Sequence, residues 1–335
     1  MSQNIVAIVQ ARVNSVRLPG KVLKKINGIP AIECLFKRLK KSKYLNNIVV
    51  STSKNKKNLP LINLLKKKSI NYYVGEDQNV LKRYYDTASK YKASIIIRIT
   101  ADSIILDYRL LDKMISQFLK KKVDFLCNTQ PMTFPDGQDI EIFSFKCLKK
   151  TYKDAKSKYE KEHVTPYIIK NKKFKKYNYE NKINYSEFRW SLDEIEDLRV
   201  IRLIYEEFKP NIYFGWEDAM KKVLKNKKKF TSNNKIIRNE GEKMSKTQKL
   251  WVRAKSLIPG GNMILSKRPE LFHPKLWPAY FSKAKDCNVW DLDGKKYTDI
   301  SLMGVGSNIL GYANSEVDSA VKAAITQSNL STLNC

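Results

Sequence analysis

The sequence predicts an α/β protein with a doubly wound, mostly parallel sheet. Ile5 to Val9 is a continuous apolar run, rich in β-branched residues, that is too short for an amphipathic helix and is typical of a strand buried on both faces. A second run of this kind, SIIIRIT, spans 94–100. Amphipathic helical segments alternate with such runs along the chain, which is the pattern of βαβ units.

The other elements follow from the spacing of apolar residues. Helices are predicted over 30–41, 77–91, 106–120 and 194–208, and strands over 47–52, 70–74, 123–128 and 138–145. In the strand predicted at 138–145, polar and apolar residues alternate, which places Asp139 and Glu141 on one face and Ile140 and Ile142 on the other. The Pro-Asp-Gly composition of 134–137 predicts a turn.

Length and charge limit the classes of function. A chain of 335 residues can hold one large α/β domain and part of another. Its formal net charge of +31 would suit nucleic acid, but most of the basic residues are lysines on predicted helix exteriors. Nucleic-acid-binding proteins favour arginine patches with interleaved aromatic side chains. We therefore expect no nucleic-acid partner.

Cysteine usage and hydropathy predict the compartment. The five cysteines are odd in number and form no C-x-x-C pair, so we expect them to be reduced; they are Cys34, Cys127, Cys147, Cys287 and Cys335. No apolar run approaches the length of a membrane span, and the first residues lack a signal-peptide pattern. We expect a cytoplasmic protein with no membrane partner.

A basic loop follows the first strand, and its polar and turn-forming residues are Gln10, Ala11, Arg12, Ser15, Arg17, Gly20 and Lys21. Ligands of open α/β sheets bind at the carboxyl ends of strands, so three cations there suit a polyphosphate. The alternative is a solvated basic loop. A Walker loop is excluded because Ser15 stands where it needs glycine and Val22 where it needs a hydroxyl. The dinucleotide fingerprint is excluded because Gly20 is the only glycine before Ile26.

Polar residues also follow two other predicted strands. Asp102 comes directly after the strand at 94–100, where one carboxylate together with nucleotide phosphates could hold Mg²⁺. The alternative is that Asp102 caps the helix predicted at 106–120. Ser51, Thr52 and Ser53 end the strand at 47–52, where they could reach a nucleotide or cap a helix, and we favour the cap.

The loop sequence QARVNSVRLPGKVL closely resembles the Q-A-R-x-x-S-x-R-L-P-G-K-x-L signature of sugar cytidylyltransferases, in the branch related to spore-coat polysaccharide and keto-sugar-acid (acylneuraminate and keto-deoxy-octulosonate) enzymes. Similar matches lie at 75–91, 135–143, 162–167 and 189–197. The resemblance implies a nucleotide-diphospho-sugar-transferase-like, Rossmann-like fold. It also implies a nucleotidyltransferase that transfers CMP from CTP to a sugar or sugar acid, with release of pyrophosphate, in cell-surface polysaccharide biosynthesis.

The resemblance further implies roles for single residues. Arg12, Lys21 and Asp102 would be catalytic, and the basic-loop residues named above would bind CTP. Asp102 and Asp193 would hold Mg²⁺. The residues that would orient the sugar are Asp139, Glu141, His163 and Arg189, although a lone histidine is more often structural. Related enzymes imply a homodimer.

The chain departs from the family pattern after the strand at 94–100. Ala101 and Ile104 stand where the resembled family has Gly and Pro around the metal-binding Asp. A non-catalytic relative is therefore the alternative function.

The rest of the chain predicts a linker and a second segment. After a nucleotidyltransferase domain over 1–221, residues 222–248 are Lys/Asn-rich and polar, which predicts a linker. Residues 249–335 resemble the amino-terminal segment of class III aminotransferases of the glutamate-1-semialdehyde aminomutase type, on LWVRAKSLIPGGNM and on the W-D-x-D-G hairpin at 290–294.

This second segment lacks the Schiff-base lysine and the Asp that pairs with the pyridine nitrogen in that family, so we expect it to be inactive alone. Pyridoxal phosphate would bind only if the full domain were present, which leaves a transaminase as a rival function. A fusion of neighbouring reading frames and the front of a longer bifunctional protein both remain open.

Overall fold

The computed structural model describes residues 3–15, 17–236, 238, 245–262, 264–273, 276–300 and 306–327. The chain divides into two compact units, Met1–Arg238 and Asn239–Cys335. Within the described ranges, no helix is both long enough and apolar enough to cross a membrane.

A seven-stranded sheet forms the centre of the first unit. Its strands lie in the order β5 (Tyr72–Gly75), β4 (Asn47–Ser53), β1 (Ile5–Gln10), β6 (Ile95–Thr100), β8 (Glu141–Ser144), β7 (Phe125–Cys127) and β9 (Lys176–Asn178). Strand β8 is antiparallel to β6 and β7, and the other strands share one direction. A small hairpin pairs β2 (Lys25–Ile26) with β3 (Ile29–Pro30). The predicted doubly wound, mostly parallel α/β fold is confirmed.

Strand β1 lies between β4 and β6 and pairs with both in parallel. Its last residue, Gln10, is aligned with Ser51 of β4 and with Thr100 of β6. The carboxyl ends of these three strands therefore meet at one edge of the sheet, which is where such sheets bind ligands.

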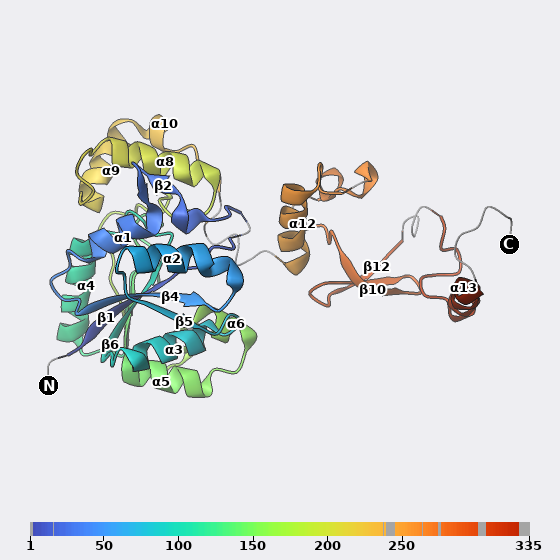
Figure 1. The fold of residues 1–335 in the computed structure, drawn as a ribbon, viewed down its shortest axis with the longest axis horizontal. Helices are drawn as coiled ribbons and strands as arrows, with labels where there is room; N and C mark the ends of the chain where they lie inside the picture. The colour runs from blue at the N-terminus through green and yellow to red at the C-terminus, as the bar shows by residue number, and fades with distance from the viewer. Residues whose placement is uncertain are drawn as a thin grey trace. The chain divides into compact units, whose positions relative to one another are not determined.

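Helices cover both faces of this sheet (Figure 1). One face packs against α1 (Ala31–Leu39), α2 (Leu59–Lys67), α4 (Tyr108–Lys121), α8 (Ile195–Glu206), α9 (Trp216–Lys225) and α10 (Lys227–Phe230). The other packs against α3 (Val80–Lys90), α5 (Phe145–Asp154) and α7 (Pro166–Lys170), and α6 (Lys158–His163) lies against α3. In β1, Ala7 and Val9 face the first layer and Val6 and Ile8 the second. This two-sided burial explains why the strand is apolar throughout.

The linker expected at 222–248 differs from the structure in its first part. Helix α9 continues to Lys225, α10 follows at once, and Phe230 and Asn233 are buried in the first unit. Residues up to 236 therefore belong to the packed unit. The polar composition was misleading because Asn233 is buried through hydrogen bonds, which leave no apolar periodicity in the sequence. Residues 237 and 239–244 of the expected linker lie outside the described residues.

The second unit contains α12 (Lys246–Leu257), a three-stranded antiparallel sheet of β10 (Phe281–Lys285), β11 (Asn288–Asp291) and β12 (Lys296–Thr298), and α13 (Ser315–Gln327). The hairpin predicted at 290–294 is confirmed. Asp291 accepts hydrogen bonds from the N–H groups of Asp293 at 2.8 Å and Lys295 at 2.9 Å, and Gly294 has a φ of 82°. A side chain would strain that conformation, which explains the glycine.

The described part of the second unit has little core of its own. Trp251 and Ala254 of α12 are buried, but α13 has no buried residue. Val321 of α13 is 49% exposed and Ile309 is 91% exposed. The described part of this unit thus exposes a large apolar surface.

Candidate functional site

The basic loop is folded back on itself between β1 and a single 3-10 turn, Lys21–Leu23. The N–H of Gly20 donates to the carbonyl oxygen of Val13 at 2.9 Å, and that of Lys21 donates to Leu18 at 3.2 Å. Gly20 has a φ of 69°, a left-handed conformation that favours glycine. The loop geometry thereby turns the Lys21 side chain inward, where it is 13% exposed. Val16 lies outside the described residues.

Lys21 joins two carboxylates that are far apart in the sequence. Its Nζ donates to Oδ2 of Asp102 at 2.7 Å and to Oδ1 of Asp193 at 2.8 Å. Burial opposes the charged ammonium, but the two carboxylates outweigh burial and raise the pKa of Lys21 above its ordinary value. Lys21 is therefore a fixed cation between two acids.

Asp102 directly follows β6, as predicted. Its backbone carbonyl accepts a hydrogen bond from the N–H of Leu192 at 3.0 Å, which ties it to the segment that carries Asp193. The cap of α4 is Asp107, whose Oδ1 accepts from the N–H of Arg109 at 2.9 Å. The alternative that Asp102 caps this helix is excluded.

Asp193 is surrounded by cations. Besides Lys21, NH2 of Arg17 lies 3.1 Å from its Oδ2, and NH2 of Arg189 lies 3.2 Å from the same oxygen. Burial opposes the carboxylate, but Lys21 and Arg17 outweigh it and lower the pKa of Asp193 to about 2. Arg17 also pairs with Glu194 at 3.3 Å. Two cations of the basic loop thus converge on one predicted metal ligand.

Asp102 and Asp193 fit a magnesium ion by their chemistry. Carboxylate oxygens from both residues already converge on one cationic atom. Mg²⁺ takes oxygen ligands and is commonly held by one or two carboxylates, with phosphates and waters completing its shell. Within the part of the chain that the structure describes, no cluster of three or more His, Cys, Asp or Glu side chains could hold a metal ion. This donor set suits a metal that arrives with a nucleotide.

Other residues of the basic loop lie apart from this cluster. Arg12 is exposed and forms no hydrogen bond or ion pair with the described residues. Gln10 is half-buried, and its Oε1 has no hydrogen-bond partner in the same ranges. Ser15 accepts a 3.5 Å bond from the N–H of Leu18, and Ala11 is buried. Arg12 and Gln10 therefore keep unused polar groups near the end of β1.

The hydroxyls that end β4 do not cap α2, so the helix-cap interpretation is wrong. Asn58 precedes α2 and makes no side-chain cap bond. Ser53 instead accepts from Nδ2 of Asn58 at 2.9 Å, and Ser51 lies 3.2 Å from the Thr87 hydroxyl. Thr52 is buried, and its hydroxyl has no partner among the described residues. The hydroxyls of Ser51 and Ser53 thus connect β4 to neighbouring elements.

Arg189, expected to orient a sugar, is 4% exposed and bound by three carboxylates. Its Nε lies 2.8 Å from Asp197, its NH1 lies 3.1 Å from Asp136 and its NH2 lies 3.2 Å from Asp193. Burial opposes its charge, but the carboxylates, led by Asp197, raise the pKa of Arg189. These contacts favour a role in holding Asp193, and direct contact with a sugar stays a prediction.

Asp136 accepts a 3.0 Å bond from the hydroxyl of Ser191 in addition to its ion pair with Arg189. Burial and the nearby Asp139 carboxylate raise the pKa of Asp136 to about 6, despite its arginine neighbours.

The other predicted sugar-side residues have separate surroundings. Asp139 binds Arg238, a residue from the expected linker. Glu141 is buried and accepts from Arg98 at 2.6 Å and from the hydroxyl of Thr165 at 2.9 Å. His163 lies beside the Tyr159 ring, with centroids 4.5 Å apart. The structure thus joins Asp102, Asp193, Arg17, Lys21 and Arg189 directly, and links Asp139 to them through Arg238, Asp136 and Arg189.

Sequence reasoning missed several members of this network, namely Asp136, Asp197, Asn233 and Arg238. Asp136 and Asp197 lie in the segments 135–143 and 189–197 that resemble family motifs, but neither was given a role in the site. Their side chains are buried or nearly so, and a buried acid near arginines has no signature in a single sequence.

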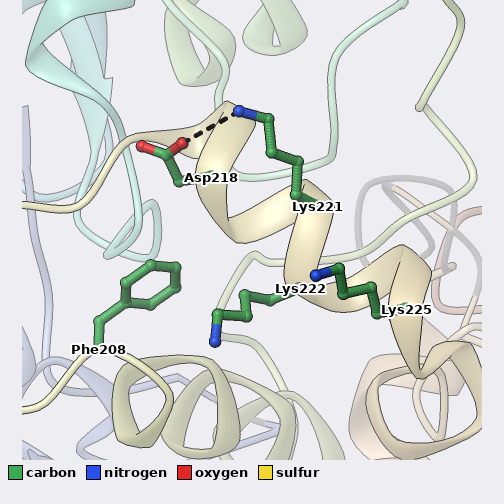
Figure 2. A pocket seen from close by; sticks show the side chains of 5 residues that line it. All are labelled: Phe208, Asp218, Lys221, Lys222 and Lys225. Atoms are coloured by element: carbon green, nitrogen blue, oxygen red, sulfur yellow. Dashed lines mark hydrogen bonds and ion pairs between the residues drawn. The ribbon is translucent and has the colours of Figure 1, made fainter.

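A pocket of about 330 Å³ lies elsewhere in the first unit, and its lining residues are Phe208, Asp218, Lys221, Lys222 and Lys225 (Figure 2). Asp218 pairs with Lys221 at 3.5 Å, and both side chains are more than half exposed. The pocket contains none of the predicted site residues, and its lysines extend from the exposed side of α9.

Comparisons with known proteins identify the class that this fold and site suggest. A family model described as cytidylyltransferase matches residues 6–247. The chain belongs to the cytidylyltransferase family.

The chain is also similar to individual proteins. An uncharacterised protein of Methanocaldococcus jannaschii is 34% identical over 207 residues, which are 61% of this chain and 84% of that protein. The spore coat polysaccharide biosynthesis protein SpsF of Bacillus subtilis is 27% identical over 212 residues, 61% of this chain and 87% of its own length. The solved structure of a cytidylyltransferase from Leptospira borgpetersenii has 31% identity and a TM-score of 0.66, and the match covers 69% of this chain and 98% of that one.

The carboxyl-terminal region is similar to aminotransferase-type proteins, as its motifs implied. The glutamate-1-semialdehyde 2,1-aminomutase of Methanocaldococcus jannaschii is 39% identical over 80 residues. The match covers 24% of this chain but only 17% of that enzyme.

Proposed function

We propose that this chain transfers CMP from CTP to a hydroxyl group of a sugar or sugar acid and releases pyrophosphate. The observation that carries the proposal is the convergence of Asp102 and Asp193 on Lys21 at the carboxyl edge of the sheet, in a chain of the cytidylyltransferase family. Oxygen ligands for a metal and a cation for phosphate lie there within hydrogen-bond distance of one another.

The chain's own residues bind and orient the nucleotide. Lys21, Arg17 and Arg12 bind the triphosphate. Asp102 and Asp193 would hold Mg²⁺, which would neutralise charge on the phosphate oxygens. The acceptor hydroxyl oxygen forms a bond to the α-phosphorus as the bond to the β-phosphate's bridging oxygen breaks. The hydroxyl proton is released, and pyrophosphate leaves with the electron pair. No covalent nucleophile is required, because positioning and charge stabilisation supply the catalysis.

The acceptor is proposed to bind on the side of Asp139, Glu141 and His163. A role in cell-surface polysaccharide synthesis is supported by the likeness to the spore coat polysaccharide biosynthesis protein of Bacillus subtilis. The homodimer stays a prediction, and the second unit is proposed to be inactive without the remainder of an aminotransferase fold.

A non-catalytic relative is the second candidate, because Ala101 and Ile104 replace residues of the resembled motif. Both side chains are buried in the core, where Ala101 is 3% and Ile104 is 0% exposed. The replacements thus alter packing beside Asp102 and leave its carboxylate in contact with Lys21. This contact favours the active enzyme.

Pyrophosphate release from each nucleoside triphosphate, measured with neutral sugars and sugar acids, tests the proposal. We expect release with CTP and a loss of at least about 100-fold in kcat for Asp102→Asn, because a metal ligand is removed. CTP binding measured without metal should be retained in this variant, because Lys21 and the arginines of the basic loop are still present. Asp218→Asn, an exposed acid outside the site, is the matched control. No release with any nucleotide would favour the non-catalytic relative.

A further inference from the structure

The segment that follows α10, residues 231–236 together with Arg238, returns to the candidate site; we call it the closing segment. Asn233 is fully buried. Its Nδ2 donates to the backbone carbonyl of Arg189 at 2.8 Å and to Oδ1 of Asp197 at 2.9 Å. A fully buried amide with two such bonds fixes the position of its partners, because leaving either partner unpaired would be costly.

Arg238 makes the second attachment of the closing segment. Its side chain is 14% exposed, its NH2 donates to Asp139, and its Nε forms an ion pair with Oδ1 of Asp136 at 3.5 Å. Asp136 and Asp139 are close enough to repel each other, since the Asp139 carboxylate helps to raise the pKa of Asp136. Arg238 places a permanent positive charge between these two acids.

The contacts of Asn233 and of Arg238 both connect to Asp193 through Arg189. Asp136, which Arg238 pairs with, binds NH1 of Arg189 at 3.1 Å. Asp197, which Asn233 binds, accepts from Nε of Arg189 at 2.8 Å and from the backbone N–H of Asp193 at 2.9 Å. Arg189 in turn lies 3.2 Å from Oδ2 of Asp193.

The charges of this network make the two attachments interdependent. Arg189 and Arg238 neutralise a cluster of buried and partly buried acids, Asp136, Asp139, Asp193 and Asp197, of which Asp193 also pairs with Lys21 and Arg17. Removing one partner of a buried charge pair leaves an uncompensated charge, and its neighbours must then move or bind protons. A loss at Arg238 would therefore draw Arg189 toward Asp136 and away from Asp193.

We propose that Asn233 and Arg238 are positioning residues that set the orientation of Asp193 through Arg189, so that binding of the metal–nucleotide complex depends on the closing segment. This inference rests on the proposed function. Neither residue touches Asp193 or Lys21, and both lie beyond the boundary at 221 that the sequence predicts for the domain. The family match to residue 247 includes them.

The test compares CTP affinity with and without Mn²⁺ in the full chain, measured by calorimetry. The basic loop binds CTP in both conditions, so the ratio of the two affinities reports how well Asp193 and Asp102 hold the metal. We expect Arg238→Met and Asn233→Ala to lower this ratio about tenfold or more, while CTP affinity without metal changes less than about twofold. Arg238→Lys keeps the positive charge but lacks the separate guanidinium nitrogens that contact Asp136 and Asp139, so it should retain part of the ratio of CTP affinities with and without Mn²⁺.

Arg199→Met is the matched control, because the Arg199 side chain is 69% exposed on α8 and its one ion pair among the described residues is with Glu196, at 3.8 Å. An unchanged ratio in a folded Arg238→Met or Asn233→Ala variant would overturn the inference. If Arg238→Met does not fold, Asn233→Ala decides the outcome, and an unchanged ratio in that variant overturns the inference. A wild-type chain that binds no CTP, with or without Mn²⁺, would instead refute the proposed function.

Discussion

Lys21→Met should separate two effects of the Lys21 ammonium, which neutralises Asp102 and Asp193 in the free chain and is proposed to bind triphosphate when CTP is present. Methionine keeps an unbranched side chain of similar length and removes the charge. Because both carboxylate oxygens lie within 2.8 Å of the same Nζ atom, they remain close to each other when the ammonium is lost.

The size of the effect follows from that geometry. Two oxygens bonded to one nitrogen at these distances are at most about 5.5 Å apart, and at an effective dielectric constant of about 20 two unit negative charges at that separation repel by roughly 3 kcal/mol. In the wild type a divalent cation must displace the ammonium from both acids, whereas in the variant it relieves their repulsion. Since about 1.4 kcal/mol corresponds to tenfold, Mn²⁺ affinity without nucleotide should rise by about 10- to 100-fold.

CTP affinity should change in the opposite direction. A charge-assisted hydrogen bond contributes about 1.5 to 3 kcal/mol, so CTP binding without metal should weaken by about tenfold or more. Mn²⁺ binding can be measured from the electron paramagnetic resonance signal of the free ion, and CTP binding by calorimetry. Lys24→Met, an exposed lysine of the same segment, is the control. Unchanged affinities for both ligands would refute the assignment of Lys21.

Two further predictions concern stability. Arg38 is fully buried, and its guanidinium donates to four backbone carbonyls, those of Leu106, Ile105, Phe214 and Ile212, at 2.5 to 3.0 Å. Arg38→Met leaves these carbonyls unpaired, so it should lower the free energy of unfolding by about 3 kcal/mol or more in urea titrations. A loss below about 1 kcal/mol would contradict this. Asp136 has a folded-state pKa of about 6, above its ordinary 3.8, so the folded chain binds this proton more tightly. The stability that this proton contributes is fully present below pH 3.8 and is lost as the pH rises through 6, by up to about 3 kcal/mol. In Asp136→Asn, the free energy of unfolding should no longer fall for this reason between about pH 4 and 6. Equal pH dependence in both proteins would show that another group is responsible.

Much of the first unit could be predicted from local patterns. The strands at β1, β4 and β6 are confirmed because strands buried on both faces contain continuous apolar runs, a signal that a single sequence carries. Helices α1, α3, α4 and α8 were also predicted, since each combines an apolar stripe with charged residues on its outer side. Helices α2, α5 and α9 were not predicted. The short helices α6, α7 and α10 were not predicted either, because one or two turns leave too little periodicity.

Part of the candidate site could likewise be predicted from the sequence, and part could not. Asp102 and the basic loop could be placed at strand ends because the carboxyl ends of parallel strands share one edge of the sheet. The contact between Lys21 and both acids depends on tertiary structure, since Asp102 and Asp193 are brought together by a backbone bond between segments ninety residues apart.

The sequence by itself determined the fold class and the family resemblance, and it predicted a phosphate-binding loop, because these depend on residue order within short segments. Only the tertiary structure decided that Arg189 is bound by Asp136, Asp193 and Asp197, and that Asn233 and Arg238 reach back to them. Buried polar networks join residues that are distant in the chain, and the side chains that form them are chosen by their partners rather than by any local periodicity.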